Sequence, residues 1–382
     1  MFTENHLKAI ENKSTPFYFY DMDLLRENLA ALNAAKGTYH VHYALKANAN
    51  PVLLHEIVAA GLGADCVSGN EVTHALSCGF KANAIAFAGV GKSDTEILTA
   101  LAAGIFAFNV ESIPELEVIN ELAKKTGKIA AIALRINPNV DAYTHKYITT
   151  GLEENKFGIN PHEFDTVLSK IAQLEHLRLE GLHFHIGSQI QDLSVFKNLC
   201  TRINEINKWF LQKGANITYI NAGGGLGVNY HEPDRYRIPD FKSFFDVFRT
   251  FLDLQPQQAV HFELGRCIVA QCGSLISKVL YVKEGVTTHF AILDAGMTEL
   301  IRPALYQAYH KIENLSVTTA ANSKYDVVGP VCESSDCFGK AVLLPPTKRG
   351  DWIAIRTAGA YGEAMSNHYN LRSAEPPVYF SK

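Results

Sequence analysis

Eight short runs of β-branched and aromatic residues, most of them followed by an amphipathic stretch, fill the first two thirds of this chain of 382 residues. The runs occupy residues 41–45, 64–67, 85–88, 106–110, 129–136, 181–184, 217–221 and 260–262. The helical patterns between them occupy residues 51–60, 71–78, 94–103, 114–125, 161–174, 193–213 and 241–254. This alternation is typical of βα units. Eight units in about 230 residues predict a (β/α)8 TIM-type barrel, with a doubly wound open sheet as the alternative.

The ends of these runs carry residues suited to chemistry. Barrel enzymes place their active sites at the carboxyl ends of the strands. In chain order, these ends hold Lys46, Asp65, Gly89, Asn109, Arg135, His185, residues 223–225 and residues 263–266. The bias toward reactive and phosphate-suited residues favours a functional site there.

The pattern changes after Arg266. Strand patterns with little helix occupy residues 274–283, 289–294, 324–328, 340–345, 352–356 and 378–380, and a further short strand at 15–21 precedes a helical stretch at 22–36. We therefore expect a barrel domain over residues 22–265 and a C-terminal β domain over residues 266–382, joined by the N-terminal strand within residues 1–21.

Composition excludes several classes of partner. The formal net charge of −4 gives no electrostatic reason to expect nucleic acid or an anionic membrane. No apolar run approaches about 18 residues, and the N-terminus lacks the form of a signal peptide. The seven cysteines are irregularly spaced and show no zinc-site pattern, so no metal is expected and a reduced cytoplasm fits best.

Lys46 stands in the segment Tyr43-Ala44-Leu45-Lys46-Ala47-Asn48. A lysine held among apolar neighbours loses hydration, its pKa falls, and its free amine can form an imine with an aldehyde. The alternative is a strand-end lysine with its ammonium in water.

Two further segments suit an anion or a flat ring. Residues 221–227 (Asn-Ala-Gly-Gly-Gly-Leu-Gly) follow a predicted strand, and glycines let backbone N–H groups surround a phosphate. A dinucleotide site is the weaker interpretation, because the third glycine spacing fails, and a flexible turn is the simplest one.

In residues 183–189 (His-Phe-His-Ile-Gly-Ser-Gln), His183 and His185 share a face, so an imidazole there can cover a heteroaromatic ring and Ser188 can bind phosphate. His183 is equally suited to an ordinary polar role.

Glu263 ends the eighth run, in His261-Phe262-Glu263-Leu264-Gly265-Arg266. A buried carboxylate there can keep a proton on a pyridine nitrogen, and Gly265 and Arg266 can bind phosphate or carboxylate. A structural Glu–Arg pair is the alternative.

The β domain adds substrate-binding candidates. Arg302 suits bidentate carboxylate binding and has a nearby phenol, Tyr306. Cys332 beside Glu333 offers a proton donor next to an ammonium binder, although a buried cysteine is the commoner role. Tyr361 lies in Gly-Ala-Tyr-Gly, where the backbone can approach a ligand.

Taken together, seven motifs resemble those of diaminopimelate decarboxylases, members of the fold-type III pyridoxal-phosphate enzymes with an alanine racemase-like fold. They are Tyr-Ala-Leu-Lys-Ala-Asn, His-Ile-Gly-Ser-Gln, Gly-Gly-Gly-Leu-Gly, Glu-Leu-Gly-Arg, Asp-Ala-Gly-Met with Ile-Arg-Pro-Ala-Leu-Tyr, Cys-Glu-Ser-Ser-Asp and Gly-Ala-Tyr-Gly. The resemblance runs from about Thr15 to Tyr379.

The resemblance implies a role for each matching residue. Lys46 would carry pyridoxal 5'-phosphate covalently, His185 would stack on its ring, Asp65 would lie near the lysine, and Glu263 would pair with the pyridine nitrogen. The phosphate would be held by Ser188, Gly225, Tyr361 and the backbone of Glu263, Leu264, Gly265 and Arg266. Substrate would be bound by Arg266, Arg302, Tyr306, Glu333 and Tyr361, and Cys332 would donate the proton.

It also implies a homodimer whose active sites are shared through the Cys332 segment, and a lid over residues 141–158. Two departures stand out: the family usually has proline at the position of Leu264, and this chain is shorter than many relatives. The expected reaction is decarboxylation of meso-2,6-diaminopimelate to L-lysine and carbon dioxide, because a distal amino-acid group needs both Arg302 and Glu333. The alternatives are decarboxylation of ornithine, arginine or carboxynorspermidine, a non-catalytic cofactor carrier and, less favoured because it needs arginine in place of Glu263, alanine racemase.

Overall fold

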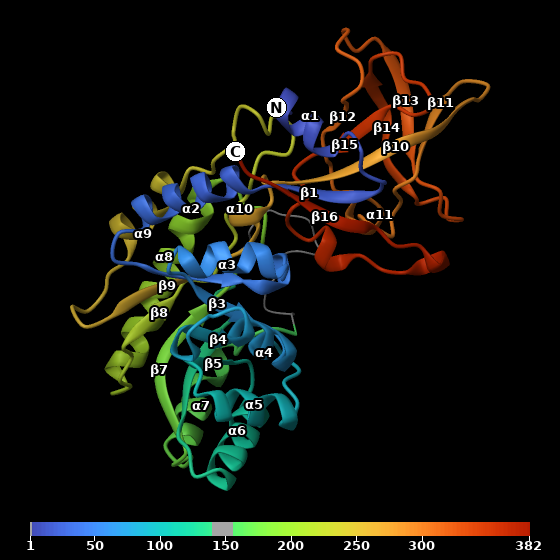
Figure 1. Ribbon diagram of the computed structural model, residues 1–382. Coiled ribbons are helices and arrows are strands. Elements are labelled where there is room, and N and C mark those ends of the chain that lie inside the picture. Colours follow the sequence, from blue (N-terminus) through green and yellow to red (C-terminus); the bar gives the residue numbers. More distant parts are fainter. Residues whose placement is uncertain (1, 140–155) are drawn as a thin grey trace. The chain divides into compact units, whose positions relative to one another are not determined.

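The structure, a computed structural model, describes residues 2–139 and 156–382 (Figure 1). Contacts divide the chain into two compact units. The barrel unit comprises Leu29–Gly227 and Asp240–Gly265, and the β unit comprises Met1–Asn28, Val228–Pro239 and Arg266–Lys382. Each unit is described by itself below.

Eight parallel strands close the barrel in sequence order, from β2 round to β9. Their bounds are β2 (His40–Ala44), β3 (Gly63–Cys66), β4 (Ile85–Phe87), β5 (Ala107–Val110), β6 (Ala130–Ile136), β7 (Leu177–Phe184), β8 (Tyr219–Asn221) and β9 (Ala259–Leu264). The closed barrel confirms the predicted fold, and the open-sheet alternative is wrong.

Helices follow the barrel strands and lie around them in Figure 1. They are α3 (Pro51–Ala59), α4 (Gly69–Ser77), α5 (Asp94–Ala103), α6 (Ile113–Lys125), α7 (Phe164–Ile171), α8 (Leu193–Gln212) and α9 (Phe241–Phe251), and α2 (Met22–Lys36) precedes β2. Local sequence sets several of their starts, because Asn50, Ser68 and Ser112 cap the first backbone N–H groups of α3, α4 and α6. Helix α7 is shorter than predicted, since its expected first turn, Pro161–Glu163, is a 3₁₀ turn.

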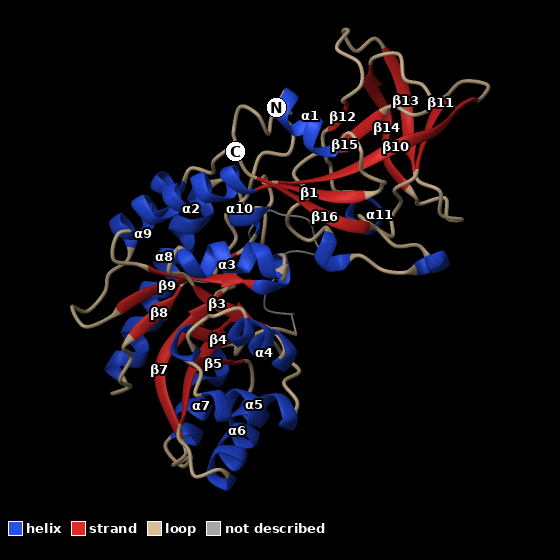
Figure 2. Cartoon of the chain, in the orientation of Figure 1, coloured by secondary structure: helices blue, strands red, loops and turns tan. Residues whose placement is uncertain are grey.

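The β unit is built on a mostly antiparallel sheet in the order β12-β15-β10-β11-β13-β14, and β1 pairs with both β10 and β16. The strands are β1 (Phe17–Asp21), β10 (Gly273–Glu284), β11 (His289–Leu293), β12 (Ile312–Asn314), β13 (Ser323–Val328), β14 (Cys337–Leu344), β15 (Trp352–Ile355) and β16 (Glu375–Phe380). Short helices α1 (Glu4–Ile10), α10 (Arg266–Val269) and α11 (Arg302–Tyr306) complete it. Figure 2 shows how strand dominates this unit. The sequence patterns do not predict β12, α1, α10 or α11, all of which are short.

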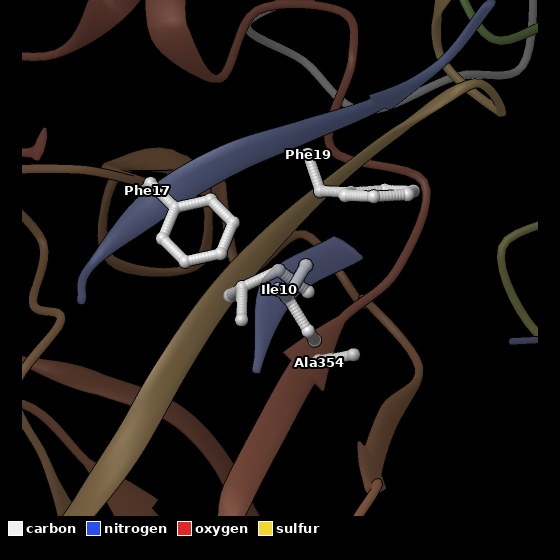
Figure 3. Close-up of a cluster of buried hydrophobic side chains, with 5 residues drawn as sticks. Ile10, Phe17, Phe19 and Ala354 are labelled. Atoms are coloured by element: carbon white, nitrogen blue, oxygen red, sulfur yellow. The ribbon is translucent and has the colours of Figure 1, made fainter. Parts of the chain in front are cut away.

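An apolar cluster joins the N-terminal strand to this sheet. Phe17 and Phe19 project from the same side of β1 toward Ile10 and Ala354, and Ile276 completes the buried set (Figure 3). Alternate residues of a strand point to one face, so a short aromatic strand can bury two large rings at once. The N-terminal residues are thereby anchored in the β unit.

No helix among the described residues is both long and apolar enough to cross a membrane.

Candidate active site

Lys46 lies in a 3₁₀ turn, Leu45–Ala47, directly after β2. Its Nζ donates a hydrogen bond of 2.8 Å to Oδ2 of Asp65, which is fully buried at the end of β3. Burial and then repulsion from Glu263 raise the pKa of Asp65 to about 6, although Lys46 acts in the opposite direction. The Lys46 side chain is 38% exposed. Its amine is therefore positioned by a carboxyl group and still accessible to a ligand.

Glu263, near the end of β9, is buried and receives three N–H donors from the barrel interior. Asn109 and Asn221 donate to Oε1 over 2.9 and 2.7 Å, and Nε2 of His183 lies 2.9 Å from Oε2. Burial by itself acts to raise the pKa of Glu263, but attraction to His183, its hydrogen bond and the Lys46 ammonium hold that pKa well below its usual range. Glu263 is therefore a carboxylate, and Oε2 keeps a lone pair for another donor.

His185 presents a neutral imidazole. The backbone N–H of Gly224 donates to its Nδ1 over 3.3 Å, so Nδ1 carries a lone pair. Burial, followed by the charges of Arg135 and Lys46, places the pKa of His185 well below its usual value. A neutral, partly exposed ring suits stacking on a positively charged heteroaromatic ring.

The loops after β7 and β8 form a tight backbone cradle. The backbone N–H of Ile190 donates to the Gly225 carbonyl over 2.8 Å, which brings the loop of Ser188 beside the glycine loop. A Cβ added at Gly223 or Gly224 would lie 2.2 Å from the Phe184 carbonyl oxygen or 2.0 Å from that of Glu263. At Gly225 it would lie 2.9 Å from the Gly187 oxygen. Only glycine fits these positions, as expected where backbone N–H groups must converge on an anion.

Leu264 ends β9, beside the strand that leads to Lys46, and Gly265 follows it. Leu264 is fully buried and lies opposite Tyr43 in the β2–β9 register. A Cβ at Gly265 would lie 3.0 Å from that of Ala47 and 3.1 Å from that of Ala44. The backbone there is closely packed with leucine at the position where the family usually has proline.

In the β unit, two buried guanidinium groups meet one phenol. Nη1 of Arg266 donates to the hydroxyl oxygen of Tyr230 over 2.7 Å, and the Arg302 guanidinium lies 5.1 Å from the centre of the same ring. Burial acts to raise the pKa of Tyr230, but Arg266 and Arg302 outweigh it and lower that pKa. The arrangement holds two cations in fixed positions.

Arg302 is also oriented by a histidine. Nδ1 of His310 donates to the Arg356 carbonyl over 2.8 Å, which leaves Nε2 to accept from Nη1 of Arg302 over 2.9 Å. Burial and the Arg302 charge lower the pKa of His310 to about 3, consistent with this neutral acceptor. The Nε of Arg302 has no hydrogen-bond partner among the described residues. The guanidinium therefore keeps donor capacity for a carboxylate.

Tyr306 and Tyr361 lie near these cations. The guanidinium of Arg266 lies 4.9 Å from the centre of the Tyr361 ring, and that of Arg302 lies 6.0 Å from the centre of the Tyr306 ring. Tyr361 has a φ of 57°, in the left-handed region that non-glycine residues seldom adopt. Such strain commonly marks ligand-binding positions.

Cys332 and Glu333 lie on an exposed loop between β13 and β14, so the interpretation of Cys332 as an ordinary buried cysteine is wrong. The loop is held in place by Asp336, a buried carboxyl group that accepts from the backbone N–H of Val331 and of Met297, each over 2.7 Å. The Tyr369 hydroxyl donates to Glu333 over 2.8 Å. A well-anchored loop thus presents a thiol and a carboxylate on the surface.

Sequence patterns do not identify the residues that support these groups. His183, Asn109 and Asn221 surround Glu263, while Tyr230 and His310 fix the two arginines. Asn109 and His183 stand out in the sequence for their positions at or near strand ends, but nothing in the spacing links them to Glu263. Residues 141–155 of the predicted lid lie outside the described residues.

Comparison with known proteins gives this geometry its context. The pyridoxal-binding domain of pyridoxal-dependent decarboxylases matches residues 22–270 of the chain. The diaminopimelate decarboxylase of Bacteroides thetaiotaomicron is 58% identical over 361 residues, which cover 94% of this chain and 93% of that relative. The enzyme of the same name from Aquifex aeolicus is 39% identical over 94% of this chain and 84% of its own length.

Solved structures agree with these relatives. A crystal structure of diaminopimelate decarboxylase from Helicobacter pylori in complex with L-lysine matches with a TM-score of 0.93 at 38% identity, over 99% of this chain and 94% of that one. A shared barrel fold by itself does not account for this sequence identity, which extends over nearly the whole chain. The chain therefore belongs to the diaminopimelate decarboxylase family of pyridoxal-dependent decarboxylases.

Proposed function

We propose that this chain decarboxylates meso-2,6-diaminopimelate to L-lysine and carbon dioxide, the last step of lysine biosynthesis. The observation that carries the proposal is the 58% identity to a diaminopimelate decarboxylase over 94% of the chain. The L-lysine bound by the Helicobacter pylori relative is the product of the proposed reaction, which supports the same substrate class.

Pyridoxal phosphate fits the residues of the barrel unit. The glycines at 223–225 leave room for backbone only, as a phosphate cradle requires. Oδ1 of Asp65 is buried without a hydrogen-bond partner among the described residues, and the neighbouring Lys46 amine is partly exposed. The residues proposed to hold the cofactor are Lys46, Asp65, His185, Ser188, Gly225, Glu263, Leu264, Gly265, Arg266 and Tyr361.

The bound cofactor supplies an electron sink for the pair left on carbon when carbon dioxide departs. Around it, Lys46 would provide the covalent attachment and His185 would stack on the ring. Glu263, kept ionised by its three N–H donors, would hold a proton at the ring nitrogen. Ser188 and the glycine loop would bind the phosphate.

The β unit supplies the groups for substrate. Arg302, with an available Nε donor and a fixed orientation, would bind the distal carboxylate, and Glu333 would bind the distal ammonium group. Arg266, Tyr306 and Tyr361 complete this set. When the bond to carbon dioxide breaks, its electron pair stays on the substrate carbon, and Cys332 would transfer its Sγ proton there to form the new C–H bond.

We further propose that the chain acts as a homodimer in the cytoplasm. An exposed, anchored loop that carries the proton donor suits insertion into the active site of a second copy. All seven cysteines are free thiols, which suits a reduced compartment. The barrel unit would then act as the cofactor domain and the β unit as the substrate and dimerisation domain.

The test is to add pyridoxal phosphate to purified protein, record its absorbance, and measure carbon dioxide and lysine released from meso-diaminopimelate. Lys46→Ala should lose both the bound-cofactor band and lysine formation, because it removes the attachment point. Lys81→Ala, at an exposed barrel position, is the matched control and should retain both.

Arg302→Met tests the substrate. Loss of the guanidinium should abolish most turnover of diaminopimelate, because no cation would then neutralise the distal carboxylate. A wild-type protein that binds the cofactor but decarboxylates ornithine or arginine in preference to diaminopimelate would refute the substrate assignment and leave the cofactor assignment intact.

A further inference from the structure

We propose that His183 is a positioning residue that fixes where a proton lies between Glu263 and the ring nitrogen of bound pyridoxal phosphate. The inference rests on the proposed role of Glu263 and goes beyond it by assigning a task to a second residue. The loaded site needs the proton on the ring nitrogen, because only a protonated ring is a strong electron sink.

The two oxygens of Glu263 are used differently. Oε1 accepts from two amides, Asn109 at 2.9 Å and Asn221 at 2.7 Å. Oε2 has His183 at 2.9 Å as the one protein donor recorded among the described residues. Oε2 is therefore the oxygen with room for a further donor, and His183 is the group that most directly sets its basicity.

His183 donates to Glu263 from a buried position. Its side chain is 1% exposed, and its Nδ1 has no hydrogen-bond partner among the described residues. The Nε2–H bond to Oε2 of Glu263 is the one hydrogen bond of this ring among the described residues.

A single buried donor is suited to this task. Hydrogen bonds to a carboxylate weaken its basicity, so a proton shared with a pyridine nitrogen stays on the nitrogen. Other ionisable groups also interact electrostatically with Glu263, namely Lys46, Asp65, His185, His42, His261 and Tyr219. Lys46 is paired with Asp65.

Without His183, Oε2 becomes the stronger base and the proton moves from the ring nitrogen toward Glu263. We test this with cofactor labelled with ¹⁵N in the ring. In the wild type, the ring-nitrogen resonance should be that of a protonated pyridine, and in His183→Leu it should move toward the unprotonated position. The dissociation constant of the cofactor should rise, and kcat fall, by roughly ten- to hundredfold, the factor expected for one hydrogen bond to a charged group. KM should change little.

His183→Gln should restore the resonance and most of kcat, because its amide nitrogen can occupy the position of Nε2. In His183→Asn the side chain is too short to place a donor at Oε2 of Glu263, so this variant should give the same results as His183→Leu. It replaces His183→Leu in the test if that variant does not fold. His42→Leu controls for the loss of a buried barrel histidine and should lower stability without moving the resonance.

Two results are decisive. If the His183 variants that fold keep a protonated ring nitrogen and kcat, the inference is wrong while the role of Glu263 stands. If the wild-type ring nitrogen is itself unprotonated, the proposed role of Glu263 fails first.

Discussion

The Lys46 ammonium donates a 2.8 Å hydrogen bond to Oδ2 of Asp65, while Oδ1 of the same buried carboxyl group has no partner among the described residues. One charged bond does not compensate fully for the loss of water around this carboxylate. Burial and the nearby Glu263 raise the pKa of Asp65 from 3.8 to about 6. Asp65 thus lowers the stability of the cofactor-free protein.

We predict that Asp65→Asn stabilises the cofactor-free protein at pH 7.5. The folded protein retains a proton on Asp65 that the unfolded chain releases between about pH 4 and 6, so stability falls as pH rises through that window. The variant should lose this dependence and gain up to about 3 kcal/mol at pH 7.5, since its amide can still accept from Lys46. Urea unfolding from pH 4.5 to 7.5 measures it. Asp253→Asn, at an exposed position, is the control, and equal pH slopes in both variants would contradict the prediction.

The opposite end of the barrel contains a histidine pair with the reverse pH dependence. Nδ1 of His42 donates to the Ala84 carbonyl over 3.0 Å, so its Nε2 must accept from Nδ1 of His261 over 2.8 Å. Burial is the main cause that lowers the pKa of both rings, to about 2 for His261. The rings of His40 and Phe106 stack on that of His261. Both members of the pair are neutral in the folded protein.

We predict that His261→Asn makes the free energy of unfolding depend less steeply on pH on the acid side. Below pH 6.5 the unfolded chain binds a proton at this position that the folded protein excludes, so stability is lost as pH falls, by about 1.4 kcal/mol per pH unit for one histidine. Asparagine can place an amide nitrogen near Nδ1 and keep the bond to His42, but it does not titrate. Unfolding between pH 5 and 7 should show the smaller slope even if absolute stability drops. An unchanged slope, equal to that of the exposed control His162→Asn, would refute it.

Glu111 is the centre of a buried network at the carboxyl end of the barrel. Oε1 accepts from Arg135 over 2.7 Å and from the Gly89 backbone over 3.2 Å, and Oε2 accepts from the Gly158 backbone over 2.9 Å. The Glu111 and Arg135 side chains are 2% and 8% exposed. The bonds tie together the ends of β4, β5 and β6.

We predict that Glu111→Ala destabilises the protein by about 3–5 kcal/mol, because it leaves a buried guanidinium without its counter-charge. Glu111→Ala combined with Arg135→Met should recover part of this loss, since the stranded charge is removed as well. Denaturant unfolding of the two single variants and the double variant gives the coupling. A cost below about 1 kcal/mol for Glu111→Ala would mean that water replaces the carboxylate.

The elements predicted from sequence are those with a strong local signal. The eight barrel strands alternate with amphipathic segments, and their predicted ends differ from the observed ones by a few residues at most, the largest difference being the four residues at the start of β7. Strand β12 has three residues and depends on pairing with β15, so no local period marks it. Helix α1 is short and stabilised by packing of Ile10 on the N-terminal strand.

The residues of the site also fall into those that the sequence identifies and those that only the structure reveals. Lys46, Asp65 and Glu263 are identifiable from their places at strand ends, which the barrel topology brings to one face. The donors to Glu263 come from residues 42, 80 and 154 positions away, so only the closed barrel reveals them. The exposure of Cys332 likewise depends on Asp336 and its partners in another loop, because the local sequence is equally compatible with burial.

Of the seven cysteines, all in the described part of the chain, Cys332 alone is exposed. We predict that Cys332→Ala lowers lysine formation by roughly 10²–10⁴-fold, the usual contribution of a general acid. Cofactor binding and unfolding should change little, since the one bond recorded for this residue uses its backbone N–H. Steady-state rates and the cofactor absorbance measure both effects, with the half-buried Cys337→Ala as control. Full activity in Cys332→Ala would remove it as proton donor.

The shared-site dimer makes a stricter prediction that mixes two inactive proteins. Lys46→Ala lacks the cofactor attachment, and Cys332→Ala lacks the proton donor. If the exposed Cys332 loop completes the site of the partner, a hybrid dimer contains one site with both lesions and one site with neither. Random exchange makes half of all dimers hybrids, so the mixture should recover about a quarter of wild-type activity. Mixing Lys46→Ala with the double variant Lys46→Ala/Cys332→Ala should recover none. If the first mixture stays inactive although native mass spectrometry detects hybrid dimers, each chain must use its own Cys332, and the loop must serve the site of its own chain.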